Sequence, residues 1–156
     1  MTTNYIKSFL SLIVSMTPAD CRGINGHKSV AHFLLAHGQA FLPRPLPGRY
    51  ERGVPKSCFM NAAHLALAHP TLTYCEGYAM RVTPVDHAWV CDYLGRVIEV
   101  TWKNPGAEYF GIPIRTNYLL TRLRVQKTYG LVDRWDERWP MLHDPPSKWL
   151  KKIQHA

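Results

Sequence analysis

Residues 71–102 read TLTYCEGYAMRVTPVDHAWVCDYLGRVIEVTW, and their pattern indicates the central sheet of the protein. Over 71–80 the side chains alternate with a period of two, which predicts a β-strand. Two more strands are predicted at His87–Cys91 and Arg96–Trp102, around a turn at Leu94-Gly95. Strands that follow one another with short connections favour antiparallel pairing.

Helical patterns surround this stretch. Three helices are predicted upstream, over Tyr5–Met16, over Lys28–His37, and from Cys58 to the residue before Pro70. Downstream, a fourth strand is predicted at Tyr109–Ile114, and residues 117–127 favour a helix. This order predicts an α+β fold in which N-terminal helices pack on an antiparallel sheet.

Length and composition indicate one globular unit. The chain has 156 residues, 46% of them hydrophobic and 19% charged, which excludes general disorder. We expect a single domain over 1–156, with its first helix inside 1–20 and an irregular wrap over 130–156. The balance of 19 Lys+Arg against 11 Asp+Glu gives +8, which excludes an acidic solvating protein and favours anionic partners.

The sequence predicts no membrane segment and a cytoplasmic location. No apolar run approaches the roughly 18 residues needed to span a bilayer. The apolar stretch near the N-terminus is short and lacks a good cleavage site, so an amphipathic helix is favoured over an export signal. The residues that share one face of that helix are Tyr5, Phe9, Leu12, Ile13 and Met16. The four cysteines of the chain, at 21, 58, 75 and 91, include no Cys-x-x-Cys pair. In a cytoplasmic protein they are expected to be reduced thiols.

Cys58 is predicted to begin a helix that has Ser57 at its N-cap. The unpaired N–H groups and the positive end of the helix dipole favour a thiolate there, although a cysteine taken alone is more often a small buried side chain. A nucleophilic thiolate needs a base, and the base needs a third group that fixes its tautomer. His87 and Glu99, on two adjacent strands, supply these parts, so Cys58, His87 and Glu99 are the candidate catalytic residues.

This ordered set resembles the transglutaminase-like branch of the papain-like cysteine enzymes. The matching pieces lie within residues 55–114: a Cys at a helix start, the strand Tyr74–Ala79, the run His87-Ala88-Trp89-Val90, and the run Ile98-Glu99-Val100-Thr101-Trp102. Glu99 stands where that branch usually has Asp, and Val100 where it usually has Pro. The resemblance implies a papain-like fold and thiol acyl chemistry on a protein, peptide or other amide substrate, with hydrolysis or transfer to another acceptor. Such chemistry needs no metal or organic cofactor.

Other functions stay open at the level of sequence. Basic residues in 115–127 and at Lys148, Lys151 and Lys152, with Tyr118, Tyr129 and Trp149 between them, fit a nucleic-acid-binding surface. An inactive papain-like scaffold that binds other proteins is a further alternative. A zinc site from Cys75, His87, Cys91 and His64 is disfavoured, because close ligand pairs are missing.

The candidate site also carries predictions of geometry. A loop of three or five residues centred on Tyr93 would set His87 directly opposite Glu99, whereas a tight Leu94-Gly95 loop would set His87 opposite Trp102. We predict the longer loop. The small residues Cys75, Gly77 and Ala79 are predicted to face the Cys58 helix. The Cys58 N–H is expected to bind an oxyanion, with Gln39, Asn61 or Tyr50 as side-chain candidates. Residues 39–57 and 103–108 are expected to wall the substrate site.

Overall fold

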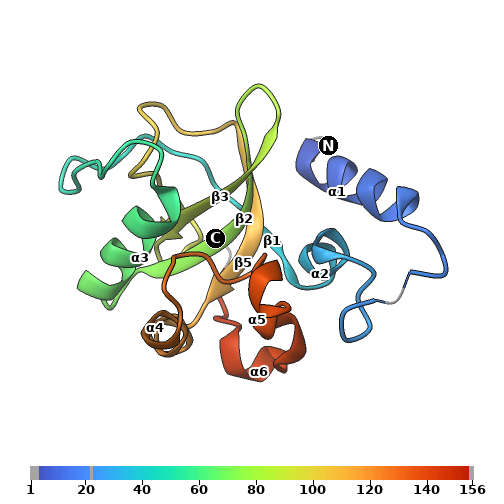
Figure 1. Ribbon diagram of the computed structural model, residues 1–156. Helices are drawn as coiled ribbons and strands as arrows, with labels where there is room; N and C mark the ends of the chain where they lie inside the picture. The colour runs from blue at the N-terminus through green and yellow to red at the C-terminus, as the bar shows by residue number, and fades with distance from the viewer. Residues whose placement is uncertain (1–3, 22, 155–156) are drawn as a thin grey trace.

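A five-stranded antiparallel sheet forms the centre of the computed structural model, which describes residues 4–21 and 23–154 (Figure 1). Its strand order is β1-β5-β2-β3-β4. The strands are β1 (Gln39–Phe41), β2 (Thr73–Met80), β3 (Pro84–Cys91), β4 (Val97–Ile98) and β5 (Glu108–Ile114). The sheet is curled, because the chain after β1 bridges the chain before β4: the Leu42 N–H donates to the Gly95 carbonyl at 3.0 Å, and the Val97 N–H to the Leu42 carbonyl at 2.9 Å.

Helices accompany this sheet in the order that the sequence predicts, so the α+β class is confirmed. The helix boundaries are α1 (Tyr5–Met16), α2 (Val30–His37), α3 (Cys58–Ala68) and α4 (Thr116–Val125). The 3-10 helix η1 (Trp135–Glu137) and the short helices α5 (Pro140–His143) and α6 (Pro146–Trp149) follow. Two differences from the expected strands stand out: β1 was not predicted, and β4 is two residues long rather than the seven of 96–102.

The two faces of the curled sheet carry separate apolar clusters. The larger cluster joins one face to the helices, and it includes Tyr74, Val90 and Phe110 together with Leu10, Leu34 and Ala63. The smaller cluster fills the opposite face with Phe41, Cys75, Ala79, Trp89, Cys91, Val97 and Tyr109. Because Cys75 and Ala79 belong to this second cluster, the prediction that the small side of β2 faces α3 is wrong. α3 supplies small residues of its own, which leave room for Tyr74, whereas the small residues of β2 make room for Trp89 and Tyr109.

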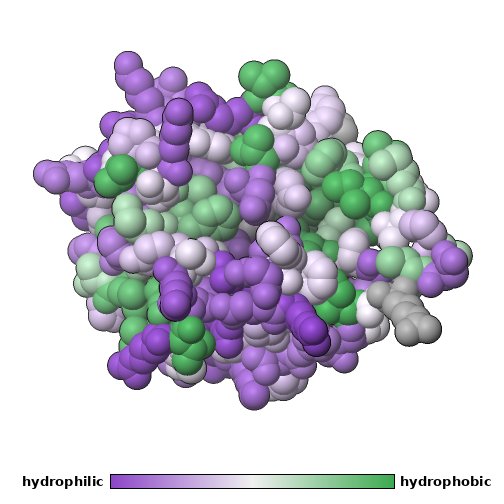
Figure 2. All heavy atoms as spheres, in the orientation of Figure 1, coloured by the Kyte–Doolittle hydropathy of each residue, from purple (hydrophilic) through white to green (hydrophobic). Residues whose placement is uncertain are grey.

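The face of α1 that packs matches the expected one only in part, because Phe9 and Ile13 pack against the larger cluster as expected but the other three residues do not. Ile6 and Leu10 are fully buried, whereas Tyr5, Leu12 and Met16 are more than half exposed. Apolar residues occupy most of the circumference of α1, so helical spacing alone did not determine which side would pack. Figure 2 shows the hydrophobic side chains that gather over this helix. Within the described part of the chain, none of the helices has both the length and the apolar character required to cross a bilayer.

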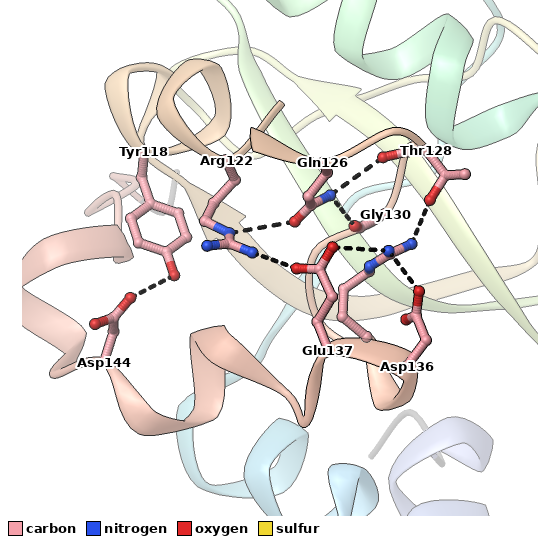
Figure 3. Close-up of polar contacts among 9 residues, drawn as sticks. Tyr118, Arg122, Gln126, Thr128, Gly130, Asp136, Glu137 and Asp144 are labelled. Atoms are coloured by element: carbon pink, nitrogen blue, oxygen red, sulfur yellow. Dashed lines mark hydrogen bonds and ion pairs between the residues drawn. The ribbon is translucent and has the colours of Figure 1, made fainter. Parts of the chain in front are cut away.

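Polar contacts hold the C-terminal segment to the sheet. The buried Glu76 carboxylate accepts hydrogen bonds from the N–H groups of Leu131 and Val132 and from the Tyr74 hydroxyl, at 2.8–3.0 Å. Figure 3 shows a second polar network, which joins α4 to the chain that follows it, and in which the Arg122 guanidinium donates to the Glu137 carboxylate at 2.7 Å. Further bonds in the same view run from Gln126 to the Gly130 carbonyl at 3.0 Å and from Tyr118 to Asp144 at 2.8 Å.

Candidate active site

Cys58 is the first residue of α3 and is half-buried. Ser57 stands at the N-cap as predicted, but its side chain makes no capping hydrogen bond. The first turn of a helix contains N–H groups that have no partner inside the helix. Because the Ser57 hydroxyl does not accept a hydrogen bond from them, the N–H groups beside Cys58 can donate to another acceptor. The positive end of the helix dipole lies at the thiol.

His87 and Glu99 form a buried pair. The His87 Nε2 lies 2.8 Å from the Glu99 Oε2, and both side chains are only 2% exposed. The other carboxylate oxygen, Oε1, accepts the N–H groups of Thr101 at 2.9 Å and Trp102 at 3.1 Å. Glu99 is therefore fixed by its own chain at the point where it meets the imidazole.

The electrostatics of this pair favour a charged imidazole. Burial alone would lower the pKa of His87, but interactions with the Cys58 thiol and the Glu99 carboxylate raise it to about 9. Burial alone would likewise raise the pKa of Glu99, yet the hydrogen bond and charge of His87 and the two N–H donors lower it. Since Nε2 faces Glu99, Nδ1 is the ring nitrogen left for the thiol. The structure thus brings Cys58, His87 and Glu99 into one cluster.

Two aromatic residues complete this cluster. The Trp102 ring stacks on the His87 ring, with centroids 3.9 Å apart and planes inclined by 18°. The buried Tyr109 hydroxyl donates to the Glu99 Oε2 at 2.8 Å and accepts the Gly106 N–H at 2.8 Å. Sequence reasoning gave neither residue a role. Two signals pointed to them: Trp102 ends a run that carries the family resemblance, and Trp102 and Tyr109 flank residues 103–108, which were expected to wall the site.

The strand register differs from the predicted one. The loop has three residues, Tyr93-Leu94-Gly95, as the longer-loop prediction allowed. The Asp92 backbone N–H donates to the Arg96 carbonyl at 3.1 Å across it. However, Val90 pairs with Ile98, so the loop is centred on Leu94 and the predicted direct opposition of His87 and Glu99 is wrong.

The observed register explains how a glutamate reaches the histidine. One residue beyond the observed pairs, Glu99 falls opposite Trp89, which makes it a diagonal neighbour of His87 on the same face. Diagonal Cβ atoms lie about 7 Å apart, compared with about 5 Å for direct partners. The additional methylene of glutamate, relative to aspartate, bridges this longer gap.

The three side chains considered for the oxyanion are placed elsewhere or already bonded. Gln39 lies in line with His87 but three strands away, through the pairs Gln39–Gly111, Gly111–Gly77 and Gly77–His87. At about 4.8 Å per strand this is about 14 Å along the sheet. The Tyr50 ring packs 5.6 Å from the ring of His69, which follows the C-terminal end of α3.

Asn61 serves as a clamp. Its Oδ1 accepts the Val54 N–H at 3.0 Å, and its Nδ2 donates to the Val54 carbonyl at 2.8 Å and to the Thr101 Oγ1 at 3.0 Å. These bonds use the whole amide and join α3 to residues on either side of it. Of the groups expected to bind an oxyanion, the Cys58 N–H lies at the start of α3 as predicted.

A hollow of about 330 Å³ lies along α3, and none of Cys58, His87 and Glu99 lines it. Its lining combines the predicted wall Glu51, Gly53 and Val54 with Val100 and with one side of α3, namely Met60, Asn61, His64, Leu65 and Ala68. Asn61 and Leu65 follow Cys58 at helical spacing along that side. The segment 51–54 is fixed here, because Arg52 donates to the Trp102 carbonyl at 3.3 Å and to the Lys103 carbonyl at 2.7 Å.

The residues considered for zinc do not form one group. Cys75 and Cys91 are buried, with sulfurs 3.4 Å apart, while His64 forms a hydrogen bond of 2.7 Å with the Tyr129 hydroxyl. Across residues 4–21 and 23–154, no cluster of three or more His, Cys, Asp or Glu side chains is arranged to hold a metal ion.

Comparison with known proteins identifies no family for this chain. No protein-family model, no curated protein and no solved structure matches this chain significantly. The case for a function therefore depends on the geometry of the chain itself.

Proposed function

We propose that this protein is a cysteine-dependent hydrolase or acyltransferase that acts on an amide or peptide bond. The observation that carries the proposal is the cluster in which a half-buried thiol at a helix start meets a buried imidazole bound to a carboxylate. A thiol, a base and an orienting acid are the parts that nucleophilic acyl chemistry requires.

The mechanism assigns one task to each residue. His87 takes the thiol proton, and Glu99 holds the resulting imidazolium by charge and hydrogen bond. The Cys58 sulfur attacks the carbonyl carbon and forms a tetrahedral oxyanion. His87 then returns the proton to the leaving amine, and the C–N bond breaks to leave an acyl-enzyme on sulfur. Water or an amine resolves this intermediate, with His87 as the base.

The start of α3 is the proposed oxyanion site. The Cys58 N–H belongs to the uncapped first turn, where backbone donors and the helix dipole both favour a negative charge. No side-chain donor is assigned to this role.

A papain-like fold of the transglutaminase-like type is part of the same proposal. It is supported by the order Cys, His, acid along the chain and by their location on α3, on β3 and directly after β4. The hollow beside α3 is proposed to bind the substrate next to the scissile bond, because it continues the side of α3 on which Cys58 lies.

Trapping of the acyl-enzyme tests this proposal. The protein is incubated with p-nitrophenyl acetate near neutral pH, and the acetylated residue is mapped by mass spectrometry. We expect one acetyl group on Cys58 and a burst of nitrophenolate. His87→Ala should slow acetylation at least ~100-fold, because it removes the general base.

Cys21→Ser is the matched control, since Cys21 is an exposed thiol outside the cluster. This variant should be acetylated like the wild type. Acetylation of Cys21 in preference to Cys58, or an unchanged rate in His87→Ala, would refute the proposed chemistry.

A further inference from the structure

Two neighbouring hollows share the Lys151-Lys152 segment as part of their lining. One has a volume of about 360 Å³ and is lined by Arg115, Thr116 and Asn117 at the start of α4, together with both lysines. The second, of about 450 Å³, shares the two lysines and adds Tyr93 and Gln154. Pro70 and Thr73 line both hollows, so the two are contiguous.

The charge around these hollows is positive and unpaired. Arg115, Lys151 and Lys152 form no ion pair with any carboxylate of the described residues, and no acidic side chain in that part of the chain lines either hollow. The cations that do have acidic partners lie elsewhere: Arg44, Arg96, Arg122, Arg134 and Lys148. Three cations that line one hollow without a counter-charge attract an anionic ligand.

The backbone holds this cluster in place. Ile114, at the end of β5, bridges Leu150, so the C-terminal segment runs antiparallel beside the strand. The Arg115 N–H donates to the Trp149 carbonyl at 2.8 Å, and the Lys151 N–H donates to the Pro113 carbonyl at 3.0 Å. The Arg115 Nε also donates to the Leu150 carbonyl at 3.0 Å, which directs the rest of the guanidinium outward. Arg115 therefore meets Lys151 and Lys152, from which it is far separated in sequence.

We propose that these hollows bind a small phosphorylated ligand, whose phosphate groups contact Arg115, Lys151 and Lys152. The volumes match a molecule of nucleotide size, and phosphate oxygens satisfy several charged donors at once. A nucleic-acid strand fits less well, because strands bind by stacking bases on exposed aromatic rings. Trp149 is fully buried and Tyr118 is 8% exposed, so Tyr93, 65% exposed, is the one aromatic side chain of the described residues that lines the hollows, which suits a single base rather than a strand.

Calorimetric titration with inorganic pyrophosphate at low ionic strength tests the proposal. We expect one saturable site whose affinity falls as salt rises, because exposed charges are screened. The double variant Lys151→Gln/Lys152→Gln should weaken binding at least ~10-fold, since each lost charged hydrogen bond costs about that factor. Both lysine side chains are exposed, so the fold should persist, as a melting curve without ligand would verify.

The matched control is Arg124→Gln/Lys127→Gln, which removes the same charge from the other end of α4. It should leave the affinity for pyrophosphate within about twofold of wild type. Absence of saturable binding, or equal weakening in both double variants, would overturn the proposal. A twelve-nucleotide single strand that binds more tightly than pyrophosphate, and is weakened equally by both double variants, would overturn it in favour of a diffuse nucleic-acid surface.

Discussion

At the scale of single residues, the site depends on how one imidazole is held. Glu99 binds the Nε2 edge of His87, Trp102 covers its face, and Cys58 raises its pKa from the other side. Tyr109 in turn fixes Glu99. The histidine is thus restrained at its edge and its face, which is the positioning that a catalytic base needs.

Glu99→Gln tests the electrostatic role of the carboxylate. The amide keeps the size of the side chain but loses its charge, so the pKa of His87 should fall from about 9 by at least ~1 unit. The His87 ring resonances, followed by NMR as a function of pH, measure this shift. An unchanged titration would show that the carboxylate does not stabilise the imidazolium.

Tyr109→Phe tests the support of Glu99. The variant removes a buried hydroxyl that both donates to Glu99 and accepts from Gly106, and it leaves the Gly106 N–H unpaired. We expect a loss of about 1–3 kcal/mol in the free energy of unfolding, measured with urea. Tyr93→Phe, at a 65% exposed tyrosine, is the control and should change stability by less than about 0.5 kcal/mol. Equal effects of the two variants would contradict the role assigned to Tyr109.

At the scale of elements, the three-residue loop between β3 and β4 sets the distance from His87 to Glu99. Asp92 closes this loop: its Oδ1 accepts the N–H groups of Leu94 and Arg96 at 3.0 Å, and the Gly95 N–H donates to its carbonyl at 3.0 Å. Gly95 has φ +73°, in the left-handed region that other residues rarely adopt. The shape of this loop therefore fixes the diagonal register.

Gly95→Ala should reduce the free energy of unfolding by about 1–2 kcal/mol, because a Cβ is strained at this backbone angle. Gly48→Ala is the control, since a Cβ there would meet open space and its backbone is not left-handed. The control should leave stability unchanged or slightly raised in the same chemical denaturation. If Gly95→Ala is as harmless as Gly48→Ala, the loop does not have the conformation described.

Local pattern predicted the elements well where they are long and periodic. The bounds of α1 and the existence of α3, β2 and β5 all follow from spacing and from Pro or Gly at their ends. β1 escaped prediction because three residues beside a proline-rich loop carry no period, and their partner strand β5 lies far along the chain. The contact of His87 with Glu99 was predicted, but from the wrong register, since the sequence does not reveal where a loop is centred.

The remaining site residues depend on tertiary packing. Tyr109 and Trp102 acquire their roles from contacts that lie across the sheet, and Asn61 from a clamp to residues seven and forty positions away. No spacing rule within one helix or strand encodes such contacts.

At the scale of the whole molecule, the raised pKa of His87 couples the site to stability. Its value of about 9 in the folded state exceeds the unfolded value of 6.5, so the stabilising contribution is complete below about pH 6.5 and is lost as pH rises through 9. The stability advantage of wild type over His87→Gln should therefore shrink between pH 6 and pH 10, by at most about 3 kcal/mol.

Urea unfolding of both proteins across this pH range measures the effect. Burial raises the pKa of Glu76 to about 7, which also lowers stability as pH rises, but Glu76 is present in both proteins and cancels in the difference. A difference that stays flat, or grows with pH, would contradict the charged state assigned to His87.

Competitive alkylation with limiting iodoacetamide near neutral pH tests most simply whether His87 activates Cys58 as a nucleophile, on which the whole proposal depends. Mass spectrometry then compares the labelling rates of Cys58 and Cys21, the two cysteines that are not buried. Although Cys21 is the more exposed, Cys58 should react at least ~10-fold faster, and His87→Ala should abolish that advantage. Faster labelling of Cys21, or a Cys58 rate that is the same in wild type and His87→Ala, would contradict the account.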